Sequence, residues 1–122
     1  MALGDMVKQN FSRDERIRKR KQYLAIYQLG KRSYSENFTA VVCRNQSETK
    51  RLGIAVAKRT VRCAAKRNRI KRLIREFFRL NKLKFSDSCD FVVIVKKNIF
   101  SLAYRDVYRE LEGLLAKKAD AE

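Results

Sequence analysis

Apolar positions recur along the chain with two periods, and the change from one period to the other marks the elements. In YLAIYQL the apolar side chains fall at helical spacing, which predicts a helix over 19–29 with Gly30 as its C-cap glycine. Two segments rich in β-branched and aromatic residues follow and predict strands over 37–44 and 51–58. The polar sequence NQSET between them predicts a turn, so the two strands are expected to form an antiparallel hairpin.

The second of these strands has two unlike faces, because side chains alternate along a strand. One face carries branched aliphatic side chains and the other only glycine and alanine: Leu52, Ile54 and Val56 on the first, Gly53, Ala55 and Ala57 on the second. The face of small residues is expected to let another group come close to the backbone.

The segment 64–81 carries apolar residues at helical period and predicts an amphipathic helix. Its apolar stripe consists of Ile70, Leu73, Ile74, Phe77 and Leu80, with Phe78 at the margin. Its opposite side consists of Asn68, Arg72, Arg75 and Arg79, with Arg69 and Lys71 on the flanks. The solvent face of this helix is therefore expected to be almost entirely cationic.

Two further elements complete the chain. The run FVVIVK is continuously apolar and predicts a strand buried on both faces, and the helical period from Tyr104 to Leu115 predicts a closing helix. Residues 1–10 and 118–122 are expected to be flexible. The order α-β-β-α-β-α predicts an α+β fold over 1–122, one domain with a small central sheet packed by helices.

The net charge of the chain indicates what kind of partner it binds. Of 122 residues, 45% are apolar, which is enough for a core, but 30 Lys and Arg against 13 Asp and Glu give a net charge of +17. Such a charge destabilises a compact state unless a polyanion neutralises it. Between positions 50 and 84, fourteen cations accompany one acid, Glu76, and like charges such as Lys71 and Arg75 lie one turn apart, which disfavours an ordinary solvated face. A nucleic acid is the expected partner, and composition leaves RNA and DNA open.

Composition argues against catalysis by this chain alone. Histidine, the commonest general base, is absent, and of the acids outside the termini and the last helix only Asp87 and Asp90 lie close together. Cys43, Cys63 and Cys89 lack the spacing of a disulfide framework or a metal site and are expected to be small buried hydrophobes. No segment has the length of a membrane span, so a cytoplasmic protein is expected.

Tyr23 and Tyr27 lie one helical turn apart, so their rings are expected to point the same way. Core packing is one interpretation of this pair. The other is an aromatic platform for unpaired bases, completed by Phe38 and the small-residue face of the second strand. The sequence leaves both open.

Residues 51–79 and the helix before them resemble a known protein family. The run RLGIAVAKRTVRCAAKRNRIKRLIREFFR, residues 51–79, resembles the signature region of the bacterial ribonuclease P protein component family: a strand ending in a basic pair, a short loop, and an RNR-containing helix. The preceding RIRKRKQYLAIYQLGKR resembles the first helix of that family, and the likeness extends over about residues 11–117. An isolated RNR would be a weak signal, but this ordered set is a specific one.

The resemblance implies a basic subunit that binds a catalytic RNA, the ribonuclease P RNA, and helps it remove the 5′ leader from precursor tRNA. It implies RNA binding by the RNR helix through Arg67, Asn68, Arg69, Lys71, Arg72 and Arg75. It implies a cleft for the single-stranded leader, lined by Tyr23, Tyr27 and Phe38, with Lys58 and Arg59 nearby. It also implies an unusual left-handed β-α-β crossover around the RNR helix, contrary to the usual hand.

The resemblance assigns no catalytic residue and no metal ligand to this chain. Phosphodiester cleavage needs metal ions, so Mg²⁺ is expected to be held mainly by the RNA subunit. No membrane and no small-molecule substrate are implied. Two positions depart from the family's pattern: Arg62-Cys63 stands where a Gly-Asn pair is usual, and Ala57 where a Ser is common.

Three other interpretations remain testable. A ribosomal or other structural RNA-binding protein would be equally basic, but substitutions in the RNR helix would not affect precursor-tRNA processing selectively. An autonomous metal-dependent nuclease using Asp87 and Asp90 would cleave without RNA. A DNA-compacting protein would bind duplex DNA as tightly as structured RNA at matched salt.

Overall fold

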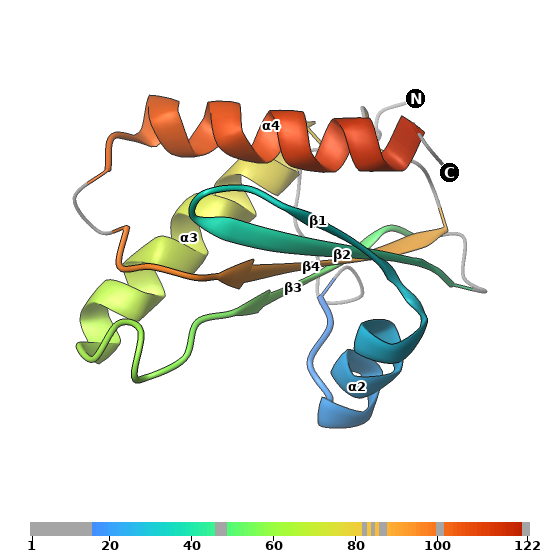
Figure 1. Cartoon of the computed structure of the whole chain (residues 1–122), viewed down its shortest axis with the longest axis horizontal. Coiled ribbons are helices and arrows are strands. Elements are labelled where there is room, and N and C mark those ends of the chain that lie inside the picture. Colours follow the sequence, from blue (N-terminus) through green and yellow to red (C-terminus); the bar gives the residue numbers. More distant parts are fainter. Residues whose placement is uncertain are drawn as a thin grey trace, which may run out of the picture.

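The computed structural model describes residues 16–45, 49–81, 83, 85, 88–99 and 102–120, with side chains up to position 115. Its elements are α2 (Arg20–Leu29), β1 (Lys31–Tyr34), β2 (Phe38–Arg44), β3 (Arg51–Ala55), α3 (Ala64–Asn81), β4 (Cys89–Val95) and α4 (Tyr104–Asp120). The α+β class is confirmed, as are all three helices and the three expected strands (Figure 1). The expected flexibility of 1–10 lies outside the described residues, and α4 continues to Asp120, further than expected.

The four strands form one mixed sheet in the order β1-β2-β4-β3. The expected hairpin between 37–44 and 51–58 is wrong, because β4 lies between β2 and β3, antiparallel to β2 and parallel to β3. A strand that is apolar on both faces is most stable in the middle of a sheet, and β4 takes that place. The hairpin partner of β2 is instead β1, whose short polar sequence KRSY gave no strand signal because it forms an exposed edge.

Helix α3 connects two neighbouring parallel strands, β3 and β4, in a β-α-β crossover. The element order and this crossover are consistent with the left-handed connection that the resemblance implies. The crossover places α3 beside β3, at one edge of the sheet (Figure 1).

Both faces of the sheet are covered by a hydrophobic core. Alternate side chains of β4 enter the core on one face and the core on the other. Phe91, Val93 and Val95 face the larger core, which includes side chains from α3 and α4. Val92 faces a smaller cluster with Ile26 of α2, and Ile94 packs against its side. Figure 1 shows α4 and α2 on opposite sides of the sheet. The prediction of a strand buried on both faces is therefore confirmed.

Gly30 ends α2 as expected, but not through a left-handed conformation, since its φ is −83°. The glycine is required by close approach. An added Cβ would lie 2.6 Å from Cγ1 of Val41 and 2.8 Å from the carbonyl oxygen of Ile26. The absence of a side chain thus lets the chain pass directly from α2 into β1.

The β1–β2 turn is held to α4 by one carboxylate, that of Glu110. The Ser35 hydroxyl and the Asn37 backbone N–H (2.7 Å) donate to its Oε2, and Asn37 Nδ2 donates to its Oε1 at 2.8 Å. Partial burial favours the neutral acid, but these hydrogen bonds outweigh it and hold the pKa of Glu110 below its ordinary value.

We expect Glu110→Gln to lower the free energy of unfolding at neutral pH by about 1–3 kcal/mol, since hydrogen bonds to a charged acceptor are weakened. A carboxyl whose pKa is depressed by folding stabilises the fold above its unfolded pKa and loses that contribution as pH falls through the folded pKa. The wild-type protein should therefore lose stability on acidification more steeply than the variant does. Urea unfolding across an acid-to-neutral pH series measures both effects.

Glu36→Gln is the matched control, because Glu36 lies in the same turn but is 77% exposed and pairs with Lys97 at 3.6 Å. This exposed ion pair should contribute no more than about 1 kcal/mol. Equal destabilisation by the two substitutions would show that the bonds of Glu110 do not hold the turn.

Candidate nucleic-acid interface

The ring of Tyr23 lies directly on Gly53 of β3. A Cβ added to Gly53 would be 2.7 Å from the Tyr23 hydroxyl oxygen and 2.8 Å from two ring carbons. The hydroxyl donates a hydrogen bond to the carbonyl oxygen of Ile17 at 3.1 Å, and burial raises the pKa of this phenol. The expected close approach to the small-residue face of β3 is therefore confirmed, and the group that approaches is Tyr23.

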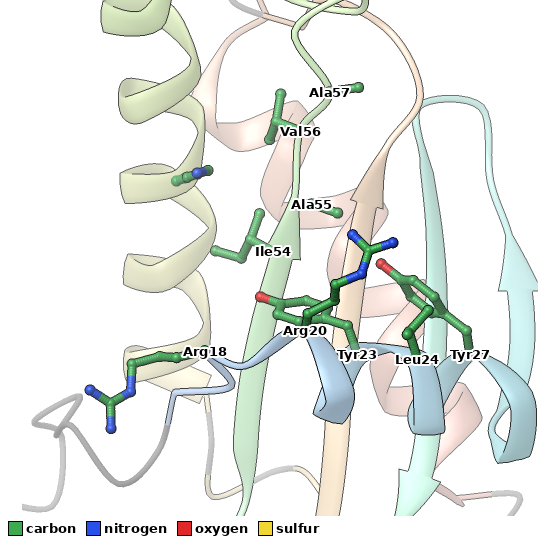
Figure 2. A pocket seen from close by; sticks show the side chains of 10 residues that line it. Arg18, Arg20, Tyr23, Leu24, Tyr27, Ile54, Ala55, Val56 and Ala57 are labelled. Carbon is green, nitrogen blue, oxygen red and sulfur yellow. The ribbon is translucent and has the colours of Figure 1, made fainter.

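Beside this contact, α2 and the end of β3 enclose an open groove of about 580 Å³. It is lined by Arg18, Arg20, Tyr23, Leu24, Tyr27, Ile54, Ala55, Val56, Ala57 and Lys71. Figure 2 shows both tyrosines reaching from α2 toward the strand, with Arg20 between them and Arg18 directed away. The groove thus has an aromatic wall and a cationic rim.

Core packing of Tyr23 and Tyr27 is confirmed, and both rings also border the groove, whereas base binding stays a prediction. Both pack against the smaller core cluster and both line the groove, with ring centroids 6.2 Å apart. The guanidinium of Arg32 lies 5.6 Å from the centroid of the Tyr27 ring. Burial raises the pKa of Tyr27, and the positive charge of Arg32 opposes that rise. The Tyr23 ring, in contrast, is held by its contact with Gly53 and its hydrogen bond to Ile17.

Phe38 does not belong to the groove, and this correction follows from the register of β2. Phe38 pairs with Val95, and both side chains enter the larger core on the other face of the sheet, where Phe38 is 0% exposed. The alternation in FTAVVCR was the signal that could have placed it there. Lys58 and Arg59 are exposed in the turn that follows the groove residue Ala57.

The amphipathic prediction for α3 is confirmed at its centre. Ile70, Ile74 and Phe77 are almost completely buried, and so is Phe78, whereas Leu80 is 42% exposed. On the other side, Asn68, Arg69 and Arg72 are exposed and Arg67, Lys71 and Arg75 are partly buried. The helix therefore presents its polar residues in two groups, one open to solvent and one that meets other parts of the protein.

Arg67 of the RNR sequence turns back onto the loop before the helix. Its Nη1 donates to the carbonyl oxygens of Val61 and Arg62, each at 2.9 Å. This guanidinium therefore supports the loop, a role that sequence reasoning did not assign to it.

Cys63 corrects the expectation that the cysteines are buried, because it is exposed immediately before α3. The backbone N–H groups of Lys66 and Ala65 bond its sulfur and lower the pKa of the thiol. The sulfur thus accepts hydrogen bonds from the first turn of the helix, as the oxygen of a capping side chain does.

A second hollow, of about 270 Å³, joins the groove to α3. It is lined by Arg16, Ile17, Arg18, Tyr23, Leu52, Gly53, Ile54, Lys71 and Arg75. Burial lowers the pKa of the Arg75 guanidinium, and the nearby charge of Arg16 lowers it further. Cations from the segment before α2 thus meet cations of α3, and sequence reasoning missed the contribution of Arg16, Arg18 and Arg20.

Of the two acids considered for catalysis, the structure describes Asp90. Asp90 is 4% exposed and accepts two bonds from the guanidinium of Arg51, both of 2.7 Å, and one of 2.7 Å from Asn45 Nδ2. Asp87 lies outside the described residues. Across the part of the chain that the structure describes, acids, cysteines and histidines form no cluster able to hold a metal ion. Among those same residues, we find no helix with the length and apolarity of a membrane span.

Comparison with known proteins adds an independent finding. A model of the family "Ribonuclease P" matches residues 11–119. The ribonuclease P protein component of Syntrophus aciditrophicus is 55% identical over 113 residues, which cover 93% of this chain and 94% of the relative. That of Desulfosudis oleivorans is 38% identical over 110 residues, 90% of either chain.

Solved structures agree with the sequence comparison. The ribonuclease P protein of Thermotoga maritima superposes with a TM-score of 0.77 at 34% identity and covers 84% of this chain and 96% of its own. The Staphylococcus aureus protein gives 0.75 at 31% identity, covering 82% and 91%. With a cationic RNR helix beside an aromatic groove and with these relatives, the chain belongs to the ribonuclease P protein family.

Proposed function

We propose that this ribonuclease P subunit acts in tRNA 5′-end maturation by holding two RNA segments at once. The solvent face of α3 binds the ribonuclease P RNA, and the groove beside α2 binds the single-stranded leader of precursor tRNA. The observation that carries the proposal is the position of Lys71, which belongs to the cationic helix and also lines the groove. One side chain therefore joins the two RNA surfaces.

The composition of α3 supports binding to a folded RNA. Arg69 and Arg72 are exposed on a helix that has no acidic residue in its first turn. A guanidinium can bond a phosphate with two N–H groups and can also stack on a base. A helix face of this kind fits the closely spaced phosphates of a structured RNA, where several are presented together.

The groove supports binding to an unpaired strand. Aromatic rings stack on any base, at about 1–3 kcal/mol per base, so a leader of variable sequence can be held. Arg20 and Lys71 line the groove together with the rings and can neutralise the backbone phosphates. A duplex keeps its bases inside, so the aromatic wall distinguishes single-stranded from double-stranded substrate.

In this proposal the chemistry and most of the Mg²⁺ belong to the RNA subunit. Cleavage of a phosphodiester needs metal ions to activate water and to stabilise the leaving oxygen. Asp90, the described member of the only candidate acidic pair, is already bonded by Arg51 and Asn45. The protein contributes charge neutralisation and grip on the substrate, and it works in the cytoplasm, where tRNA is made in bacteria.

Mapping of the 5′ ends of the products tests whether the protein or the RNA cleaves precursor tRNA, and at which position. Precursor tRNA is incubated at near-physiological Mg²⁺ with the protein alone, with a bacterial ribonuclease P RNA alone, and with both. We expect cleavage at the mature 5′ end to be stimulated only in the mixture. Cleavage by the protein alone would establish an autonomous nuclease, and no effect on the RNA would leave a structural RNA-binding protein.

We expect Tyr27→Ala to weaken binding of leader-bearing precursor tRNA to the reconstituted holoenzyme by about 5- to 150-fold, since one stacked base is lost. Binding of mature tRNA should not change, and Tyr27→Phe should restore the affinity because the ring is kept. Tyr104→Ala is the control, since Tyr104 is a partly exposed tyrosine on α4. Equal losses for precursor and mature tRNA would contradict leader binding in the groove.

We expect Arg72→Gln to reduce the salt dependence of binding to ribonuclease P RNA. Each lost phosphate contact should make the slope of log K against log salt less negative by about 0.7–0.9. Arg105→Gln, which removes an exposed cation from α4, should leave the slope unchanged. A salt titration of the affinity gives the result, and identical slopes for the wild type and both variants would place the RNA away from α3.

A further inference from the structure

The sheet face that carries the groove is built from two cross-strand rows. Residues paired in register lie side by side with their side chains on the same face. The first row is Arg32, Val41, Val92 and Gly53, and the second is Tyr34, Thr39, Ile94 and Ala55. Helix α2 covers the first row, with Tyr23 on Gly53 and Tyr27 beside Arg32. The second row leads out from under the helix.

This second row begins in the groove and ends at the edge of the sheet. Ala55 lines the groove, and Tyr34 lies on β1, the edge strand (Figure 1). Between them, Ile94 is partly buried and Thr39 is 6% exposed. Three inter-strand steps separate the ends of the row by about 14 Å. This row of side chains therefore connects the groove to the edge of the sheet.

At the sheet edge, the second row ends in an aromatic ring that lies near a cation. Tyr34 is 66% exposed, and Nζ of Lys96 lies 6.0 Å from the centroid of its ring. Lys96 follows Ile94 by two positions, so it leaves the strand on the same face. Arg32 of the first row makes the same kind of pair with Tyr27 of α2, with its guanidinium 5.6 Å from the ring centroid. The groove face thus repeats one arrangement, a tyrosine with a cation over its ring.

An exposed tyrosine and lysine near a sheet edge could also serve only to keep that edge from pairing with another chain. Two features favour binding instead. The pair continues the row that lines the groove, and the net charge of +17 makes an anionic strand the complementary occupant. Lys96 interacts electrostatically with the carboxylate of Glu110. The oxygens of that carboxylate accept hydrogen bonds from Ser35 and Asn37.

We propose that Tyr34 and Lys96 form a second binding site for single-stranded RNA, in which Tyr34 stacks on a base and Lys96 neutralises the adjacent phosphate. The strand runs from the groove across Ile94 to this site. The inference rests on the proposed function, since the strand is the precursor-tRNA leader. It adds a separate contact that only a longer leader can reach.

A ladder of precursor tRNAs, with leaders lengthened one nucleotide at a time, tests the proposal in holoenzyme reconstituted with a bacterial ribonuclease P RNA. For the wild type, affinity should rise in two steps as the leader grows. Tyr34→Ala should remove only the second step, a loss of about 5- to 150-fold for long leaders, and Tyr34→Phe should keep it. Lys96→Gln should make the salt slope less negative by about 0.7, for long leaders only.

Tyr27→Ala separates this proposal from the function on which it rests. A Tyr34→Ala ladder identical to that of the wild type, with the first step still lost in Tyr27→Ala, would overturn the second site and leave the groove in place. Retention of both steps in Tyr27→Ala would overturn leader binding itself. A Tyr34→Ala loss that is equal at every leader length, with an unchanged circular dichroism spectrum, would also refute a site reached only by long leaders.

Discussion

The structure depends on one strand that is apolar on both faces. β4 cannot lie at the surface of a two-layer protein, because either face would then expose valine or phenylalanine side chains to water. It must have a strand on each side and a layer above and below. The larger core on the α3 and α4 side satisfies one face, and the short helix α2 satisfies the other. Even the acid within β4, Asp90, is tolerated because Arg51 and Asn45 bond it.

The candidate interface follows from the unequal size of these two layers. Helix α2 has 10 residues and covers only part of its sheet face, whereas α3 has 18 residues. The uncovered remainder of the face becomes the groove, and the residues around it need not be apolar. The crossover then brings α3 beside β3, so its cations lie at the wall of the groove. The elements that satisfy the packing requirement of the sheet therefore also form the candidate interface.

Within the residues that the structure describes, the sequence predicted the three helices and three of the four strands, because each of these carries a clear period. It failed where the outcome depends on competition between segments. Nothing local to 37–44 or 51–58 shows that β4 separates them, and β1 has too few apolar residues to be recognised. The resemblance placed Tyr23 and Tyr27 at the groove, but it also placed Phe38 there, whereas the register of β2 directs Phe38 into the larger core. The place of Arg16 beside α3 and the contact of Arg67 with the loop could not have been predicted, since both arise only in the folded chain.

The contact between Tyr23 and Gly53 couples two positions thirty residues apart in the chain. A side chain at position 53 and a ring at position 23 would occupy the same space, so neither position can be replaced independently of the other. A larger residue at position 53 would push the Tyr23 ring outward and narrow the groove. A smaller residue at position 23 would leave a gap above Gly53. The width of the groove is thus determined by a pair of residues that must change together.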